Sequence, residues 1–286
     1  ALDLASTDRM VDFYLEAGVT GITILGIMGE APKLSGDEAL TFARRVLARA
    51  GGAVPVVVGV SAAGIDPMAR LAHAVMEAGA GGVMVAPQPS LRTEAKLRGY
   101  MAQVCAALPD IPICFQDYPT TTGVEVSVDT ILRLTVDHPQ IVMLKHEDWP
   151  GLGKLSRVRA ETGTGDVPRL SILTGNSALF LPQEMARGAD GAMTGFAYPE
   201  MLVEVVARYK AGDADGAEDV FDAYLPLVRY EQQLGLGLAI RKEVLHRRGV
   251  LAAPKVRAPG PALNATDHAE LSRLIARLEA RLAALA

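Results

Sequence analysis

The 286-residue sequence has only two cysteines, no excess of positive charge and no long apolar run. Cys105 and Cys114 are too few for a disulfide framework or a thiolate metal site, so we expect two reduced core residues in a cytoplasmic protein. A formal net charge of −5 argues against a nucleic-acid or anionic-membrane partner, because both require a basic surface. No stretch reaches the roughly 18 apolar residues that cross a bilayer, and no signal peptide is recognisable. A small-molecule partner is the simplest expectation.

Half of the residues are hydrophobic, and they form strand-like runs that alternate with helical segments. The predicted strands are residues 21–26, 54–60, 82–86, 111–116, 141–145, 170–174 and 191–195. Helical patterns are predicted at residues 8–17, 37–50, 67–78, 93–108, 128–136, 152–162, 177–187 and 200–211. This alternation predicts a parallel sheet, and so many repeats favour a closed barrel over an open sheet.

A closed barrel of this type needs eight strands, whereas seven are predicted here. We therefore expect a (β/α)8 TIM barrel over residues 1–211 whose first strand lies upstream of Ala1. An open sheet, which needs no missing strand, is the alternative. Residues 212–286 contain consecutive helical patterns at 214–230, 233–248 and 265–284. We expect these helices to pack on the barrel as a C-terminal appendage without forming an independent domain.

Lys145 ends the apolar run of residues 141–144, which has the pattern of a strand buried on both faces. An amine at the mouth of such a strand is held partly out of water, which disfavours its charged form. Because a neutral amine is a nucleophile, Lys145 is a candidate for Schiff-base chemistry on a ketone or aldehyde. The alternative is a lysine that only reaches solvent.

The other candidate site residues also follow predicted strands, where parallel barrels carry their functional groups. They are Ile27, Met28, Gly29, Gln116, Tyr118, Glu147, Met193, Thr194 and Gly195. Glycines let the backbone approach a ligand, and exposed N–H groups can bind the carboxylate of a 2-oxo acid.

Alternation along a strand sorts the residues around Lys145 into two faces. Glu147 should share the face of Lys145 and could move protons, or it could pair with a loop cation. Gln116 should likewise share a face with Tyr118, whereas His146 should point to the opposite face. The residues Asp117, His146 and Glu147 do not converge in this geometry, so no metal site is expected.

Several motifs resemble the dihydrodipicolinate synthase and N-acetylneuraminate lyase family. They are residues 26–30, Tyr118-Pro119 with Gly123, Lys145, Thr174-Gly175 and residues 191–195, which together span nearly the whole chain. The resemblance implies a Schiff-base barrel in which Lys145 attacks a 2-oxo acid. It also implies that the backbone at Met28 and Gly29 holds the acid's carboxylate, that Met193 flanks it, and that the protein forms a homotetramer.

The chain departs from the synthase pattern at each hydroxyl of the synthase's proton relay. Ile27 and Met28 replace a threonine pair, Gln116 replaces a tyrosine, and Gln88 lies near the position of the neighbouring subunit's tyrosine. Thr121 stands where the synthase has an arginine for its second substrate. Lysine biosynthesis is therefore not the expected role.

The L-2-keto-3-deoxyarabonate dehydratase branch is more similar to this chain. The shared motifs are Gln116-Asp117, Lys145-x-Glu147 with Pro150-Gly151, residues 191–195, and Leu225-Pro226-Leu227 with Glu231. Residues 26–30 depart from that branch, which leaves the sugar end of the substrate open. We expect a dehydratase that needs no cofactor beyond its covalent Schiff base, with a pyruvate aldolase or a synthase-like lyase as alternatives. A barrel that binds a 2-oxo acid without turnover is the non-enzyme alternative.

Overall fold

The computed structural model describes residues 1–285 and divides into two compact units. One unit comprises residues 20–175 and 183–193 and contains every strand, so we call it the sheet unit. The other comprises residues 1–19, 176–182 and the chain from Thr194 onward, and we call it the helical unit. The predicted boundary at residue 211 stays a prediction.

A single parallel sheet of seven strands organises the sheet unit, and its strands neighbour each other in chain order. They are β1 (Ile22–Ile24), β2 (Val56–Gly59), β3 (Gly82–Val85), β4 (Ile113–Asp117), β5 (Ile141–His146), β6 (Ser171–Thr174) and β7 (Gly191–Ala192). This order confirms the predicted parallel topology. The expectation of a further strand before Ala1 stays a prediction.

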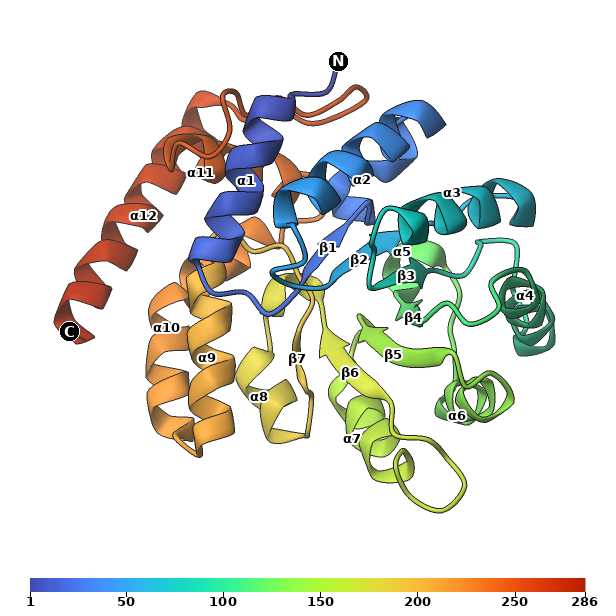
Figure 1. The fold of residues 1–286 in the computed structure, drawn as a ribbon. Coiled ribbons are helices and arrows are strands. Elements are labelled where there is room, and N and C mark those ends of the chain that lie inside the picture. Colours follow the sequence, from blue (N-terminus) through green and yellow to red (C-terminus); the bar gives the residue numbers. More distant parts are fainter. Residues whose placement is uncertain (286) are drawn as a thin grey trace. The chain divides into compact units, whose positions relative to one another are not determined.

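Amphipathic helices separate these strands and lie around their outer side (Figure 1). They are α2 (Gly36–Ala50), α3 (Ile65–Glu77), α4 (Glu94–Ala107), α6 (Val128–Asp137) and α7 (Leu152–Glu161), with the short α5 (Pro119–Thr122) between β4 and α6. Side chains that accept backbone N–H groups begin several of them. Ser35 and Glu38 form a capping box on α2, and Ser127 caps α6. Local sequence therefore sets where these helices start.

Small and sulfur-containing side chains fill part of the core of the sheet unit. Met84, Cys114 and Met193 form a buried cluster, and Val57, Met143 and Leu173 pack against it. Because strand residues two apart share a face, Cys114 and Met143 lie on the face that carries Gln116 and Lys145 further along β4 and β5. Along β4 and β5, a layer of apolar side chains therefore lies just before the polar side chains at the C-terminal ends of the strands.

The helical unit contains α1 (Leu4–Glu16), α9 (Pro199–Ala211), α10 (Ala214–Glu231), α11 (Gly237–Arg247) and α12 (Ala265–Leu285). Helix α10 packs against α9, α11 and α12. Its last residue, Glu231, is fully buried and pairs with Arg241 of α11 at 2.5 Å. An unpaired buried charge would be strongly destabilising, so this ion pair stabilises the packing of α10 against α11.

Several elements differ from the predicted bounds. Helix α1 begins at Leu4 instead of residue 8, because Asp3 accepts the Ser6 N–H and caps it. The predicted helix 177–187 is interrupted, since Ser177 and its neighbours have positive φ and only Leu181–Ala186 (α8) is helical. Strand β7 ends at Ala192, earlier than expected.

Within residues 1–285, no helix combines the length and apolarity that crossing a membrane requires. The expected cytoplasmic location stays a prediction.

Candidate active site

Strand pairing brings Gln116 and Lys145 together at the C-terminal ends of β4 and β5. The two residues are direct partners in the register of the parallel ladder. Gln116 is 3% exposed, and the Lys145 side chain is 12% exposed. The predicted lysine at a strand mouth is therefore largely withdrawn from water, with a neutral amide beside it.

Glu147 joins these two side chains. Its Oε2 accepts a hydrogen bond from Gln116 Nε2 at 2.6 Å and lies 3.2 Å from Lys145 Nζ. The geometry agrees with the prediction from strand alternation that Glu147 and Lys145 share a face. One carboxylate oxygen therefore contacts both the candidate nucleophile and a neutral amide donor.

Gly175, immediately after β6, leaves the space that Glu147 occupies. A Cβ built on Gly175 would lie 2.2 Å from Glu147 Oε1 and 2.4 Å from its Cγ, which are distances no real side chain tolerates. Gly175 follows a predicted strand, but its contact with Glu147 could not be predicted from sequence patterns, because it joins the end of β5 to the chain after β6. Only glycine permits this approach.

The thiol of Cys114 lies in the apolar layer two residues before Gln116 on β4. Burial raises the pKa of this thiol to about 12, although the charge of Lys145 acts to lower the pKa. The thiol is therefore protonated at neutral pH. Cys114 is a packing residue next to the site and no competing nucleophile.

The loop after β1 carries the predicted carboxylate-binding residues. Residues Ile27–Gly29 form one 3-10 turn, in which the Gly29 N–H donates to the Gly26 carbonyl at 3.0 Å. Leu25 and Glu30 flank this turn with positive φ values of 54° and 58°. Non-glycine residues rarely adopt this conformation, and strained backbone concentrates at functional sites. Met28 is 42% exposed at the tip of the turn.

The remaining predicted residues divide between the two units. Met193 is buried in the cluster with Cys114, so it belongs to the sheet unit. Tyr118 is half-buried and directly precedes α5. Thr194 and Gly195 belong to the helical unit, where a Cβ on Gly195 would meet Arg241 Nη1 at 2.4 Å. Contacts therefore join Gln116, Lys145 and Glu147 but do not join Tyr118 to them.

A second polar row, which was not predicted from the sequence, is formed by the residues that directly follow the inward-facing ones. Asp117 pairs in register with His146, and His146 pairs with Thr174. All three side chains are buried, as is Glu184 of α8. The same alternation that placed Lys145 inward could have predicted this row on the opposite face.

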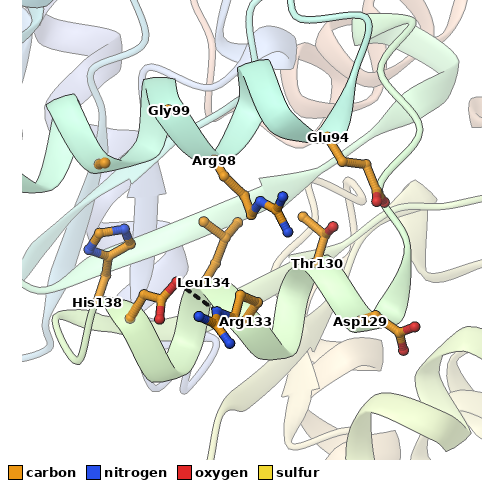
Figure 2. Close-up of a pocket in the computed structure, with 10 residues that line it drawn as sticks. Glu94, Arg98, Gly99, Asp129, Thr130, Arg133, Leu134 and His138 are labelled. Atoms are coloured by element: carbon orange, nitrogen blue, oxygen red, sulfur yellow. Dashed lines mark hydrogen bonds and ion pairs between the residues drawn. The ribbon is translucent and has the colours of Figure 1, made fainter.

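A groove of about 720 Å³ between α4 and α6 is a separate surface feature (Figure 2). It is lined by Glu94, Arg98, Gly99, Ala102, Asp129, Thr130, Arg133, Leu134, Asp137 and His138. Several of its charged groups are already engaged, since Arg133 pairs with Asp137 at 3.0 Å and Glu94 accepts the Ser127 N–H. None of the predicted site residues lines this groove.

Within residues 1–285, no group of three or more His, Cys, Asp or Glu side chains is arranged to hold a metal ion.

Comparison with known proteins assigns this chain to a family. The model of the dihydrodipicolinate synthetase family matches residues 1–278. The chain belongs to this family. It is 31% identical over 282 residues to the L-2-keto-3-deoxyarabonate dehydratase of Azospirillum brasilense, covering 97% of this chain and 89% of that protein. It is 32% identical over 286 residues to a 4-hydroxy-tetrahydrodipicolinate synthase of Sorangium cellulosum, covering 98% and 91% of the two chains.

A crystal structure of dihydrodipicolinate synthase from Rhodopseudomonas palustris matches with a TM-score of 0.94 and 50% identity, covering 96% of this chain and 91% of that one. The parallel sheet of this member of the dihydrodipicolinate synthetase family is thus that of a TIM barrel, with helices following it. The predicted fold class is confirmed.

Family membership also makes the protein an enzyme, a class I lyase of a family that uses Schiff bases with 2-oxo acids. This finding favours catalysis over the non-enzyme alternative. The relatives divide between dehydration and synthesis at nearly equal identity, so the reaction has to be argued from the residues.

Proposed function

We propose that this protein dehydrates a 2-keto-3-deoxy sugar acid such as L-2-keto-3-deoxyarabonate through a Schiff base on Lys145. The observation that carries the proposal is the double contact of Glu147 Oε2, which lies 2.6 Å from Gln116 Nε2 and 3.2 Å from Lys145 Nζ. A carboxylate beside the nucleophile is a suitable general base, and a neutral amide can orient it without exchanging a proton.

The first stage makes the substrate acidic at C3. Lys145 Nζ attacks the C2 carbonyl, and loss of that oxygen as water gives an iminium ion. The positive nitrogen withdraws electrons, so a base can remove a C3 proton and form the enamine. Glu147 takes this proton, since its carboxylate already lies within reach of Nζ.

The second stage expels the C4 hydroxyl. The enamine electrons form the C3–C4 double bond, and protonated Glu147 returns its proton to the departing hydroxyl, which leaves as water. A proton shift from C5 to C3 leaves a C4–C5 enol, and its conversion to the aldehyde together with hydrolysis of the iminium releases a semialdehyde of 2-oxoglutarate and free Lys145. Water lost from C4 is the net change.

The turn Ile27–Gly29 is the candidate site for the substrate carboxylate. Its flanking residues, Leu25 and Glu30, have positive φ, and Met28 is exposed at its tip. The Gly29 N–H already donates to the Gly26 carbonyl, and the other backbone N–H groups of the turn could bind an anion without a cationic side chain. Met193, in the buried cluster with Cys114, would pack against the reacting carbons.

A synthase activity is the second candidate, because the Rhodopseudomonas palustris structure carries that name at 50% identity. Against it stands Gln116, an amide with no proton to relay where the synthase has a tyrosine hydroxyl. Aldol cleavage, the third candidate, would break the C3–C4 bond and release pyruvate from the same Schiff base.

Product analysis with the sugar acid separates these candidates. L-2-keto-3-deoxyarabonate should yield a semialdehyde that an NAD-linked aldehyde dehydrogenase oxidises. Pyruvate release would identify an aldolase instead. Useful condensation of pyruvate with aspartate semialdehyde would identify a synthase and refute the argument from Gln116.

The chemistry of Lys145 is tested without the sugar acid. Borohydride reduction in the presence of pyruvate should add the mass of the reduced adduct to the peptide that contains Lys145. Lys145→Ala should abolish both this label and turnover, whereas an unlabelled wild-type peptide would refute the proposed nucleophile.

We also propose that the protein is a homotetramer, as the family resemblance implies. Light scattering at micromolar concentration should give four times the mass of one chain. A monomer mass would contradict this proposal.

A further inference from the structure

Lys154 lies in the first turn of α7, where only 11% of its side chain is exposed. Its ammonium contacts two carboxylates that come from different segments. Asp117 Oδ2, at the end of β4, lies 2.6 Å from Nζ, and Asp148 Oδ2, in the loop after β5, lies 3.0 Å from it. One buried cation therefore joins three segments of the sheet unit.

The Asp117 carboxylate depends on this ammonium. Its side chain is 0% exposed, and neither of its oxygens accepts a hydrogen bond among residues 1–285, so Lys154 approaches it as an ion pair without hydrogen-bond geometry. The nearest other nitrogen in an ion-pair position, His146 Nδ1, is 3.7 Å away. Burying a charge without a partner is strongly unfavourable, so Lys154 fixes the place of this carboxylate.

The two carboxylates that Lys154 contacts lie on either side of Glu147. The Asp117 carbonyl accepts the Glu147 N–H at 2.8 Å, which continues the β4–β5 ladder by one residue. Asp148 is the next residue in the chain, and it accepts a hydrogen bond from Lys154. The backbone of Glu147 is therefore held between two residues that the same ammonium ties to α7.

A second contact closes the loop between β5 and α7. His146 Nε2 lies 2.9 Å from the Gly151 carbonyl, which joins the residue before Glu147 to the start of α7. A Cβ on Gly151 would lie 2.5 Å from this nitrogen, so only glycine admits the ring. Because the loop is closely packed and tied across its ends, a displacement at α7 reaches Glu147.

Resting on the proposed function, in which Glu147 is the base, we propose that Lys154 is a positioning residue that holds the Glu147 carboxylate beside Lys145. Strand alternation places Asp117 on the face opposite to Gln116, so its partner Lys154 lies behind the strand ends. The ammonium does not touch the reacting atoms. It acts through the backbone of β4 and of the loop after β5.

Exchange of the methyl protons of pyruvate for deuterium measures the placement of Glu147 without the sugar acid. When pyruvate forms a Schiff base on Lys145, its methyl group becomes C3 of the iminium. The base removes a C3 proton, the C–H electrons form the enamine, and the enamine takes up a deuteron from D2O. Proton NMR follows this exchange, whereas borohydride trapping at Lys145 reports the nucleophile alone.

Lys154→Met keeps the length of the side chain and removes its charge. We expect the exchange rate to fall by about 10- to 100-fold, because a misplacement of about 1 Å can lower a rate by about 10². Trapping at Lys145 should remain, since the nucleophile is unchanged. Equal loss of exchange and trapping would overturn the proposal.

A double variant shows whether Lys154 acts through Glu147. In a Glu147→Gln background the base is already absent, so adding Lys154→Met should not lower the exchange rate further. Effects that multiply would overturn the proposal, because Lys154 would then act independently of Glu147. Undiminished exchange in Glu147→Gln itself would refute both the base and its positioning.

If Lys154→Met does not fold, Asp117→Asn combined with Lys154→Met takes its place. The two changes remove both buried charges, so the fold should be recovered. The tie between Asp148 and α7 is still absent, so exchange should stay low. Recovery of wild-type exchange together with stability would show that Lys154 only compensates a charge, and would overturn the proposal.

Arg159→Met is the matched control on the same helix. Arg159 pairs with Asp190 at 2.6 Å, and its side chain is 20% exposed, but Asp190 directly precedes β7 at the edge of the sheet opposite to the site. This variant should lose stability and keep its exchange rate per folded molecule. A loss of exchange like that of Lys154→Met would overturn the assignment. A chain that responds as expected in every exchange assay but dehydrates nothing would refute only the proposed function.

Discussion

Gln116 Nε2 donates to Glu147 Oε2 at 2.6 Å, and both side chains are buried. A hydrogen bond to a carboxylate is stronger than one between neutral groups, so the amide holds Glu147 beside Lys145. A tyrosine at the same position could pass a proton, whereas glutamine can only orient its neighbour. This single contact therefore favours chemistry in which one carboxylate both removes and returns the proton.

Removing the charge of Glu147 should separate proton transfer from Schiff-base formation. We expect Glu147→Gln to lower the rate of sugar acid dehydration by about 10² to 10⁴, the usual contribution of a general base. Pyruvate trapping at Lys145 should remain, since nucleophile and base are distinct roles. Mass spectrometry of the trapped peptide and a coupled turnover assay measure the two quantities. Equal loss of both signals would contradict the assignment.

Removing the amide of Gln116 should lower the turnover rate without abolishing activity. A hydrogen bond to a charged group contributes about 1.5 to 3 kcal/mol, so Gln116→Leu should lower kcat by roughly 10- to 150-fold. The control is Gln103→Leu on α4, where the exposed amide contacts only the Gly99 carbonyl and turnover should not change. Steady-state kinetics compare the two variants, and an unaffected Gln116→Leu would show that Glu147 needs no such support.

A methyl group on Gly175 should displace Glu147. The new Cβ would lie 2.2 Å from Oε1, so we expect Gly175→Ala to lose most of the turnover. The same clash should lower the free energy of unfolding by about 1 to 3 kcal/mol. Gly153→Ala in α7 is the matched control. Nothing lies within 4 Å of its Cβ, and alanine should stabilise the helix by about 0.5 to 1 kcal/mol. Urea unfolding and turnover assays distinguish this local clash from a general intolerance of alanine.

Burial raises the pKa of the Glu184 carboxyl to about 7, and this shift predicts how stability depends on pH. Between about 4.5 and about 7, the folded chain keeps a proton that the unfolded chain has lost. The free energy of unfolding should therefore decrease as the pH rises through this window, by at most about 3 kcal/mol from this group. Glu184→Gln removes the titrating carboxyl, so its stability should change less than that of the wild type. Urea unfolding at both ends of the window provides the measurement, and parallel curves for the two proteins would refute the prediction.

The sequence alone determined the alternation of strands and helices and the identity of the nucleophile candidate. Buried parallel strands are unbroken apolar runs, and a lysine that ends one of them stands out from its neighbours. Alternation of side chains also placed Glu147 on the face of Lys145, because that rule depends only on adjacent residues.

Only the tertiary structure decided which atoms meet across strands. The contacts of Glu147 with Gln116 and with the space left by Gly175 join β5 to β4 and to the end of β6, so strand register sets them. The polar row of His146 and Glu184 likewise depends on how α8 is placed against the sheet. Helix bounds were predicted less well wherever a local cap or positive φ outweighed periodicity, as at Asp3 and Ser177. Periodicity indicates which face of an element a residue occupies. The side chains that this residue contacts are set by close packing between segments distant in sequence.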